Sequence, residues 1–382
     1  MAEPLLRAEA LTRRFGGLTA VNAVSLTLHR GELHAVIGTN GAGKSTLINM
    51  LSGEMPASSG RIALAGEDIT AWSQPRRARA GVGRSYQRTT IFPPLSVFEN
   101  TRLCAQSRRP APWALWQSAA RCAASGDTAT LAIRAAGLAD VADRPAGALS
   151  HGQQRQLEIA MCLATQPRVL LLDEPLSALD LKLRQHMRSE LRAIQRRVGL
   201  TFIYITHDQG EALTMSDHVA VMREGVIDQI ADGRTIYDDP STAFVASFVG
   251  ENNSFTGQVS ATADGMARLD TPAGPLRGRI ASAAQGRLRA GDRAMLFVRP
   301  ESLALAGIGV EGEDSVTGRV IAEEFEGPSC HLFLDGPGGV PLKVSLVNQG
   351  AGGAIGVGAM LTVRFDPRKA VVLPPGNLAE EE

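Results

Sequence analysis

The segment Gly38-Thr39-Asn40-Gly41-Ala42-Gly43-Lys44-Ser45 constrains the fold of this chain more than any other. An apolar run at residues 34–37 leads into it, and residues 46–51 follow with helical character. The order predicts a buried strand, a glycine loop and a helix in succession. A unit of this kind is the central element of an α/β domain with a parallel sheet.

The residue types in this loop predict a site for nucleotide phosphates. Gly41 and Gly43 let backbone amides turn inward around phosphate oxygens, and the start of the following helix adds a favourable field. Lys44 supplies positive charge for the outer phosphates, and Ser45 offers a hydroxyl ligand for Mg²⁺. The predicted nucleotide-binding residues of the loop are Gly38, Thr39, Asn40, Gly41, Ala42, Gly43, Lys44, Ser45 and Thr46.

Two further apolar runs predict strands that end in polar residues. Residues 169–172 lead into Asp173 and Glu174, and residues 201–206 lead into His207. Carboxyl ends of parallel strands meet at one sheet edge, so we expect Asp173 to join the Mg²⁺ site. Glu174 is then the candidate base for the attacking water, and His207 a hydrogen-bond donor to the γ-phosphate. The alternatives are that Glu174 only caps the following turn and that the backbone satisfies His207. Gln87 is a weaker candidate for contacts to Mg²⁺ or water.

A second anion site is predicted at residues 150–154. Ser150, Gly152 and Gln153 begin a segment of helical character, so a hydroxyl and a glycine amide lie at a helix start. A simple helix cap is the alternative interpretation. The position of this motif shortly before Asp173 favours the phosphate role.

Composition limits the classes of protein that the chain can represent. Its 382 residues predict two domains. Lys plus Arg (39) equal Asp plus Glu (39), so the chain has no net positive charge that would attract it to nucleic acid or to an anionic membrane. We expect the arginines Arg76, Arg77, Arg79, Arg84 and Arg88 to form a solvated face rather than to bind nucleic acid.

The four cysteines show no paired spacing, which fits a reducing cytosol. The start of the chain lacks the features of a secretory signal, and no apolar run approaches the ~20 residues that span a bilayer.

The pattern of apolar residues, glycines and prolines changes along the chain and predicts two domains. Residues 1–242 predict an α/β domain with a mostly helical subdomain at about 88–165, which includes Trp113 and Trp116. After residue 250, short β-type runs broken by glycine and proline predict a small barrel or a pair of barrels, giving a second domain at 243–375 and a solvated tail at 376–382.

The order of these motifs resembles that of the nucleotide-binding subunits of ABC transporters, over nearly the whole chain. The resemblance implies a P-loop ATPase fold, hydrolysis of ATP with Mg²⁺, and a dimer in which each ATP lies between the glycine loop of one copy and the signature motif of the other. Ser150 and Gly152 would then serve the partner's ATP. The residues that match are Phe15 for adenine stacking, Gly38 to Thr46 for Walker A, Gln87 for the Q-loop, Leu149 to Gln153 for the signature, Asp173 and Glu174 for Walker B, Ser177 to Asp180 for the D-loop, and His207 for the switch histidine.

Two subfamilies share the likeness. Residues 15–18, 83–87 and 149–160 look like the ATPases of branched-chain amino acid importers, whereas residues 173–180, 206–212, 236–240 and 298–301 look like those of polyamine, iron and sugar importers. The last segment lies in what resembles the OB-like TOBE regulatory domain of the second group. His151 stands where a glycine is usual in the signature.

From this resemblance we expect the ATPase subunit of an importer of polyamine type, for spermidine, putrescine or a related solute. The alternative is a branched-chain amino acid importer. Its partners would be a second copy in a homodimer, transmembrane permease subunits and, indirectly, a periplasmic or extracellular solute-binding protein, with no nucleic acid. It would lie at the cytoplasmic face of the inner (plasma) membrane. A soluble ABC ATPase acting on ribosomes or DNA and a simple P-loop kinase are rival hypotheses from other classes.

Overall fold

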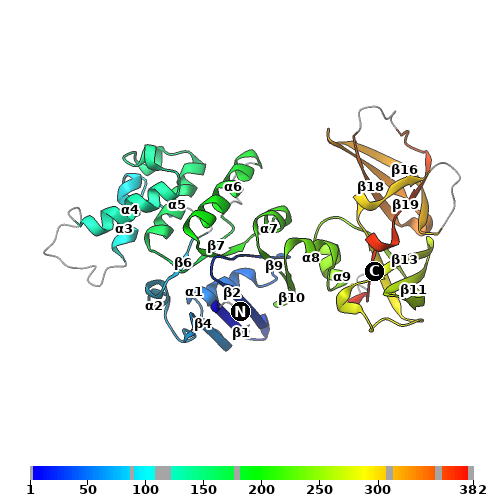
Figure 1. Ribbon diagram of the computed structural model, residues 1–382, viewed down its shortest axis with the longest axis horizontal. Coiled ribbons are helices and arrows are strands. Elements are labelled where there is room, and N and C mark those ends of the chain that lie inside the picture. Colours follow the sequence, from blue (N-terminus) through cyan, green and yellow to red (C-terminus); the bar gives the residue numbers. More distant parts are fainter. Residues whose placement is uncertain are drawn as a thin grey trace. The chain divides into compact units, whose positions relative to one another are not determined.

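The structure is a computed structural model that describes residues 3–86, 90–107, 122–175, 181–306, 313–348 and 355–376. The chain divides into two compact units, Met1–Gly233 and Arg234–Glu382. Figure 1 shows the elements of each unit, coloured along the sequence. None of the described helices is both long enough and apolar enough to cross a membrane.

A six-stranded sheet forms the centre of the first unit. The strands that were expected from the apolar runs, β3 (Leu33–Gly38), β7 (Val169–Asp173) and β8 (Thr201–Ile205), lie in it as parallel neighbours in the order β3-β8-β7. All residues of β3 and β8 are buried, which explains their continuous apolar runs. The full order is β10 (Val226–Ala231), β9 (His218–Arg223), β3, β8, β7 and β6 (Val82–Arg84).

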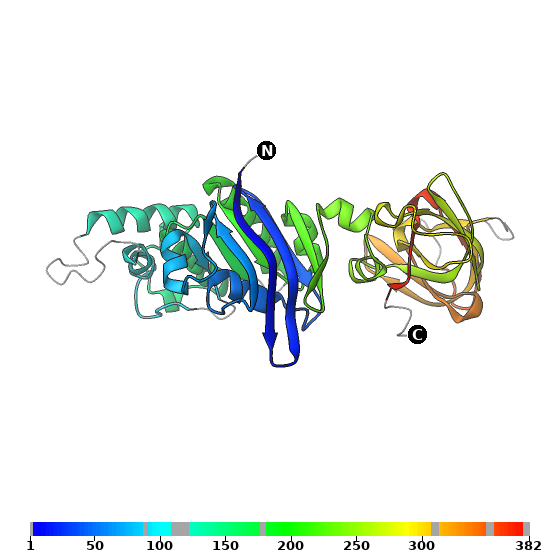
Figure 2. The same cartoon turned by 90° about the horizontal axis from the view of Figure 1, so that it is seen from below.

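A second, antiparallel sheet was not predicted from the sequence. Its order is β2 (Leu18–His29), β1 (Pro4–Phe15), β4 (Ser59–Leu64) and β5 (Glu67–Asp68). The long strands β1 and β2 run side by side in Figure 2. Leu11, Val21 and Leu26 from this sheet share one buried core with Leu47 and Ile48 of α1 (Lys44–Ser52), the helix that follows the glycine loop.

The other helices of this unit surround the sheet or form the helical subdomain. The subdomain contains α3 (Val97–Gln106), α4 (Ala123–Ala135) and α5 (His151–Ala164), and its core of Val97, Ile133 and Leu157 is separate from the one beneath α1. The predicted helix of residues 183–198 is α6 (Leu181–Val198), which buries Met187, Leu191 and Ile194. The remaining two are α2 (Gln74–Ala80) and α7 (Gln209–Met215).

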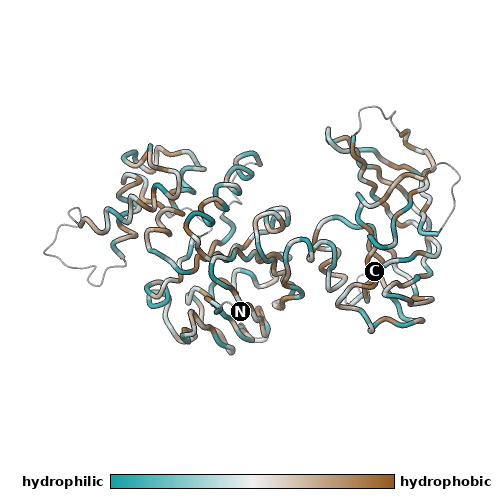
Figure 3. The backbone as a smooth tube through the Cα atoms, viewed as in Figure 1, coloured by the Kyte–Doolittle hydropathy of each residue, from teal (hydrophilic) through white to brown (hydrophobic). Residues whose placement is uncertain are grey.

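The second unit contains one closed barrel and a separate five-stranded sheet. The predicted strands of this region all form, but only one of the two sheets closes. Along β12 (Met266–Thr271) and β13 (Gly274–Ile280), buried residues alternate with more exposed ones. Figure 3 colours the backbone by hydropathy and shows hydrophobic and hydrophilic residues mixed along this unit. The barrel consists of β11 (Asn253–Ala263), β12 (Met266–Thr271), β13 (Gly274–Ile280), β20 (Val371–Leu373) and β14 (Arg293–Val298). The sheet has the order β15 (Ala304–Ala306), β19 (Met360–Arg364), β16 (Ser315–Phe325), β17 (Ser329–Asp335) and β18 (Pro341–Val347). The helices α8 (Gly233–Asp238) and α9 (Ala243–Phe248) precede β11 in the chain.

Candidate functional site

The glycine loop joins β3 to α1 in a conformation that needs glycine. Gly43 has a φ of 97°, and a Cβ there would lie 2.3 Å from the carbonyl oxygen of Ala20. A Cβ on Gly38 would lie 2.0 Å from the carbonyl oxygen of Met222. The first turn of α1 has no acidic residue, and no side chain caps its amides. The loop therefore leads into a helix start without a side-chain cap or an acidic neighbour, and such a helix start favours an anion.

Lys44 lies inside this loop. Its Nζ donates hydrogen bonds to the carbonyl oxygens of Gly38 at 2.8 Å and Thr39 at 2.9 Å. Burial lowers the pKa of Lys44, and the nearby carboxylates of Glu174 and Asp173 oppose that shift. The ammonium group is therefore positioned at the loop, where the outer phosphates of a nucleotide would lie.

The ends of β7 and β8 bring two predicted residues together. Glu174 follows β7 directly, and its amide donates to the carbonyl oxygen of Ile205, the last residue of β8. His207 Nδ1 lies 3.6 Å from Glu174 Oε1. Glu174 has a φ of 44°, a left-handed conformation that is costly for a side chain of this size. A carboxylate and an imidazole thus meet beside the strand that carries the phosphate loop.

Asp173 has a partner that was not predicted from the sequence, Arg84 at the end of β6. Arg84 Nη2 lies 3.3 Å from Asp173 Oδ2, and its Nη1 lies 2.7 Å from Glu54 Oε2. Burial raises the pKa of Asp173, and the charge of Arg84 opposes the rise. The Arg84 side chain is only 9% exposed, so its assignment to a solvated face was wrong. The parallel pairing of β6 with β7 is the reason, because it places Arg84 opposite Leu171 and next to the end of β7.

The second predicted anion motif begins α5. The Ser150 side chain accepts a hydrogen bond from the Gln153 amide at 3.3 Å, and Gln153 Oε1 accepts one from the Ser150 amide at 3.2 Å. This capping box confirms the helix-cap interpretation as the local role. Ser150 is also exposed, which leaves it accessible to a phosphate group, and the phosphate role stays a prediction.

Comparisons with known proteins give the family. The chain is 37% identical over 371 residues to the spermidine/putrescine import ATP-binding protein PotA of Rubrobacter xylanophilus, covering 96% of this chain and 93% of that protein. It is 40% identical over 308 residues to the protein of the same name from Pseudomonas aeruginosa strain UCBPP-PA14, covering 80% of each. Family models described as ABC transporter and as TOBE domain match residues 21–177 and 296–373. The chain belongs to the ABC transporter ATP-binding proteins.

Solved structures support the same assignment for the fold. The ATP-binding cassette MJ1267 of an ABC transporter has a TM-score of 0.57 and 27% identity, covering 64% of this chain and 98% of that one. The protein cbiO1 from Clostridium perfringens, part of the ABC transporter complex cbiONQ, has a TM-score of 0.54 and 27% identity, covering 61% of this chain and 90% of that one. The expected ABC ATPase fold followed by a β-rich TOBE region is confirmed, and the protein is an ATPase that binds ATP.

Two buried arginines of this ABC protein were also missed from the sequence. Arg155 in α5 donates from Nε to the Pro175 carbonyl oxygen at 2.6 Å and from Nη1 to that of Tyr86 at 3.2 Å, and it pairs with the buried Glu158. It therefore ties α5 to the turn after β7 and to the segment after β6. The signal was present in the sequence as a charge pair three residues apart, but that spacing is equally typical of an exposed helix face.

The second is Arg77, which is 1% exposed and also contradicts the predicted solvated face. Its Nη1 donates to the carbonyl oxygens of Met50 at 2.6 Å and Leu51 at 3.0 Å, near the end of α1. Nη2 donates to Thr70 O at 2.8 Å and Nε to Trp72 O at 3.1 Å. Arg77 therefore supplies donors to two carbonyls in the last turn of α1, one of which, that of Met50, also accepts from the Gly53 amide at 3.3 Å.

Three predicted site residues remain. Phe15, the predicted adenine platform, is 42% exposed at the end of β1, and the Arg13 guanidinium lies 4.7 Å from its ring centroid. Gln87 and Asp180 lie outside the described residues, as do Trp113 and Trp116.

Proposed function

We propose that this protein is the ATP-hydrolysing subunit of a polyamine-type importer, with spermidine, putrescine or a related solute as cargo. The observation that carries the proposal is the extent of the similarity to PotA import proteins, which at 37% identity covers both the ATPase and the TOBE-containing part of the chain. In this proposal a separate permease carries the solute across the membrane, and the ATPase subunit supplies the energy by hydrolysing ATP.

We assign the site residues from the geometry described above. The Walker A residues Gly38, Thr39, Asn40, Gly41, Ala42, Gly43, Lys44, Ser45 and Thr46 would hold the phosphates of ATP, with Phe15 against the adenine. Glu174 would activate water, and His207, 3.6 Å from it, would contact the γ-phosphate. The neighbouring Glu174 and Asp173 would keep separate roles, because Asp173 lies 3.3 Å from Arg84 whereas Glu174 lies 3.6 Å from His207.

The oxygen donors at this site fit Mg²⁺. A serine hydroxyl and an aspartate carboxylate are ligands that Mg²⁺ uses together with phosphate oxygens. Ser45 is exposed at the start of α1, and Asp173 ends β7. The ion would neutralise charge on the phosphates, and Arg84 could keep its contact with Glu54 when Asp173 turns to the ion. Gln87 would complete the set.

A second copy and a permease are the proposed partners. Ser150, Gly152, Gln153 and Asp180 would serve the ATP of the partner copy in a homodimer. A groove of about 750 Å³ in the first unit is lined by the apolar Val82, Leu103 and Met161 and by the charged Arg79, among others. This mixed lining suits a short amphipathic helix, and we propose that the permease docks there. The protein would then lie at the cytoplasmic face of the plasma membrane, and a solute-binding protein would act through the permease.

One observation favours a branched-chain amino acid importer instead. The residues Gly83, Arg84, Ser85 and Tyr86 line the proposed docking groove, and this segment resembles branched-chain importer ATPases. If the permease docks at this surface, the groove favours a branched-chain importer, whereas the second domain favours a polyamine-type importer.

Transport assays with the reconstituted system would separate the two. The permease and binding-protein genes adjacent to this gene would be co-expressed with it and placed in proteoliposomes. The proposal predicts ATP-dependent uptake of labelled spermidine or putrescine and no uptake of leucine. Uptake of leucine alone would establish the alternative. Uptake of neither would refute both cargo classes, provided that ATP hydrolysis by the complex is intact.

A further inference from the structure

Three side chains of types that bind metal ions lie together at the amino ends of two parallel strands, at the opposite end of β3 from the phosphate loop. Glu32 directly precedes β3, His34 is the second residue of β3, and His218 begins β9. Parallel pairing of these strands places His34 opposite His218. The strand rise puts Gly38, where the phosphate loop begins, roughly 13 Å further along β3. The cluster is therefore distinct from the ATP site although it shares a strand with it.

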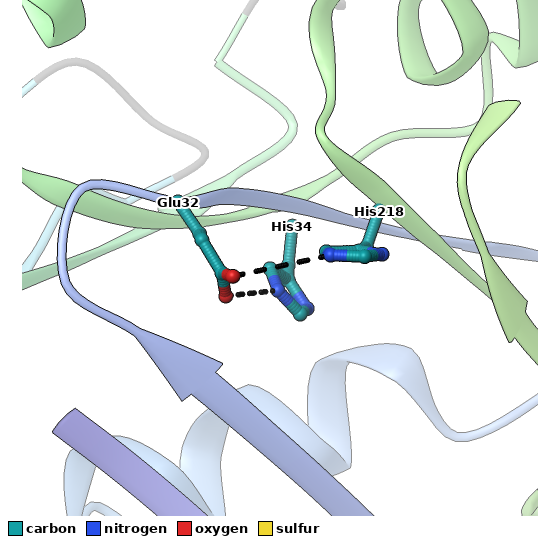
Figure 4. Close-up of side chains that lie close together, drawn as sticks. All are labelled: Glu32, His34 and His218. Carbon is teal, nitrogen blue, oxygen red and sulfur yellow. Dashed lines mark hydrogen bonds and ion pairs between the residues drawn. The ribbon is translucent and has the colours of Figure 1, made fainter. Parts of the chain in front are cut away.

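The geometry of the cluster is that of converging donors. His34 Nε2 lies 3.0 Å from Glu32 Oε2, and His218 Nε2 lies 3.9 Å from Glu32 Oε1. The ring centroids of the two histidines are 4.9 Å apart. One donor atom from each residue fits within 4.8 Å of the others. Figure 4 shows both imidazoles turned toward the same carboxylate.

The buried member of the cluster is incompletely paired. His34 is 3% exposed, and its Nδ1 has no hydrogen-bond partner in the part of the chain that the structure describes. A buried imidazole with an unpaired nitrogen is unfavourable, since buried polar atoms normally find a partner. The other ring nitrogen, Nε2, lies 3.0 Å from Glu32 Oε2. An ion bound at Nε2 would replace this contact at a side chain that the fold has already desolvated.

The surroundings hold the three residues in place. The His29 amide donates to Glu32 Oε2 at 2.7 Å, which fixes the carboxylate. The Asp217 carboxylate accepts from the Leu33 amide at 2.8 Å and pairs with Arg192 at 2.5 Å, which ties the starts of β3 and β9 together. Such outer contacts orient ligands before an ion binds.

We propose that Glu32, His34 and His218 bind one divalent transition metal ion of the Zn²⁺ class. Two imidazoles and one carboxylate with an open fourth position are a common ligand set for Zn²⁺, and the nitrogen donors disfavour Mg²⁺ and Ca²⁺. Ligand atoms about 2.0–2.2 Å from a tetrahedral ion lie roughly 3.3–3.5 Å from one another. One donor atom from each residue now lies within 4.8 Å of the others, so side-chain shifts that close these separations by up to about 1.5 Å reach that spacing. The His218 side chain is 41% exposed, so a solvent ligand and an entry route are available.

A bound ion would connect β3 to β9 and bind only the folded chain, because the cluster joins residues far apart in the sequence. Ion binding would then stabilise the first unit. At a free ion concentration 100 times the dissociation constant, the unfolding equilibrium constant falls about 100-fold.

The test uses the full chain without a histidine tag, freed of metal and titrated with Zn²⁺ by equilibrium dialysis in excess Mg²⁺. The proposal predicts one saturable Zn²⁺ per chain. His218→Ala, which alters an exposed side chain, and Glu32→Gln should each weaken binding by at least about tenfold. Co²⁺ added in place of Zn²⁺ should give the visible absorption of a four-coordinate site, and His218→Ala should remove it.

His331→Ala is the matched control. His331 also lies beside a carboxylate, 3.4 Å from Glu326, but lies outside the cluster. This variant should bind Zn²⁺ as the unaltered chain does. Absence of saturable binding to the unaltered chain, or an equal loss in all three variants, would show an incidental cluster of side chains and overturn the proposal. Failure of the importer proposal would leave this result unaffected, because the assay needs neither ATP nor a permease.

Discussion

Replacing Arg155 with methionine should destabilise the ATPase unit by about 3–5 kcal/mol, because it leaves Glu158 as a buried charge without its ion partner. Glu158 is 6% exposed, and its Oε1 also accepts a hydrogen bond from the Thr90 amide at 2.7 Å, which does not supply a positive charge. The substitution also leaves the Pro175 carbonyl, 2.6 Å from Arg155 Nε, without that donor. Methionine keeps most of the apolar volume, so electrostatics dominate the loss.

The loss should depend on pH in a defined direction. Burial raises the pKa of Glu158 above its ordinary value of 4.5, while Arg155 and the Thr90 amide oppose the rise. Without Arg155 the pKa in the folded state rises further. A carboxyl whose folded pKa exceeds its unfolded pKa binds protons more tightly in the folded state, so stability falls as pH rises from the unfolded to the folded pKa. The deficit of Arg155→Met should therefore be smallest below about pH 4.5 and grow above it.

Denaturant unfolding followed by tryptophan fluorescence measures this loss directly. All three tryptophans, Trp72, Trp113 and Trp116, belong to the first unit, so the signal reports its unfolding. The double variant Arg155→Met/Glu158→Gln removes the charge and should recover most of the loss. The exposed Arg197, which donates to the Ala135 carbonyl at 3.0 Å, is the control, and Arg197→Met should change stability by less than about 0.5 kcal/mol. A loss below about 1 kcal/mol in Arg155→Met, or a double variant no more stable than the single one, would refute the reasoning.

Three further predictions concern single positions. Glu174→Gln should lower ATP turnover by about 10²- to 10⁴-fold while ATP binding persists, and near-normal turnover would remove Glu174 from its proposed role. Arg77→Met should cost at least about 3 kcal/mol in a denaturation experiment because carbonyls at the end of α1 lose charged donors. Arg76→Met, which alters a guanidinium 3.8 Å from a tryptophan ring, should cost under about 1 kcal/mol, and equal losses would contradict the assignment. Gly43→Ala should weaken ATP binding far more than Gly41→Ala, because both have positive φ but only Gly43 lacks space for a Cβ; similar affinities would show that the clash relaxes.

The parts of the site that lie at strand ends were predictable from the sequence. Each of the apolar runs before Gly38, Asp173 and His207 is a parallel strand, and parallel strands deliver their following residues to one edge. The meeting of Glu174 and His207 at 3.6 Å follows from that rule.

The missed features depend on pairings between distant segments. Arg84 contacts Asp173 because β6 pairs with β7, 89 positions further along the chain, and local pattern carries no sign of that pairing. The sheet of β1 and β2 was missed for a related reason, since its strands mix buried and exposed residues without a clear period. Arg77 lies in an arginine-rich segment that is typical of a solvated surface, yet the C-terminal end of α1 makes it a buried donor.

In the proposed dimer each ATP site needs two copies of the chain, and a mixed dimer tests this requirement most directly. Two differently tagged copies, both carrying Glu174→Gln to retain ATP, would be purified as dimers and assayed for trapped ATP. A Lys44→Ala copy paired with a Ser150→Arg copy has both changes in one composite site, so the account predicts one trapped ATP per dimer. A copy carrying both changes, paired with one carrying neither, should trap none. The reverse pattern would show that Lys44 and Ser150 act within one chain and would contradict the account.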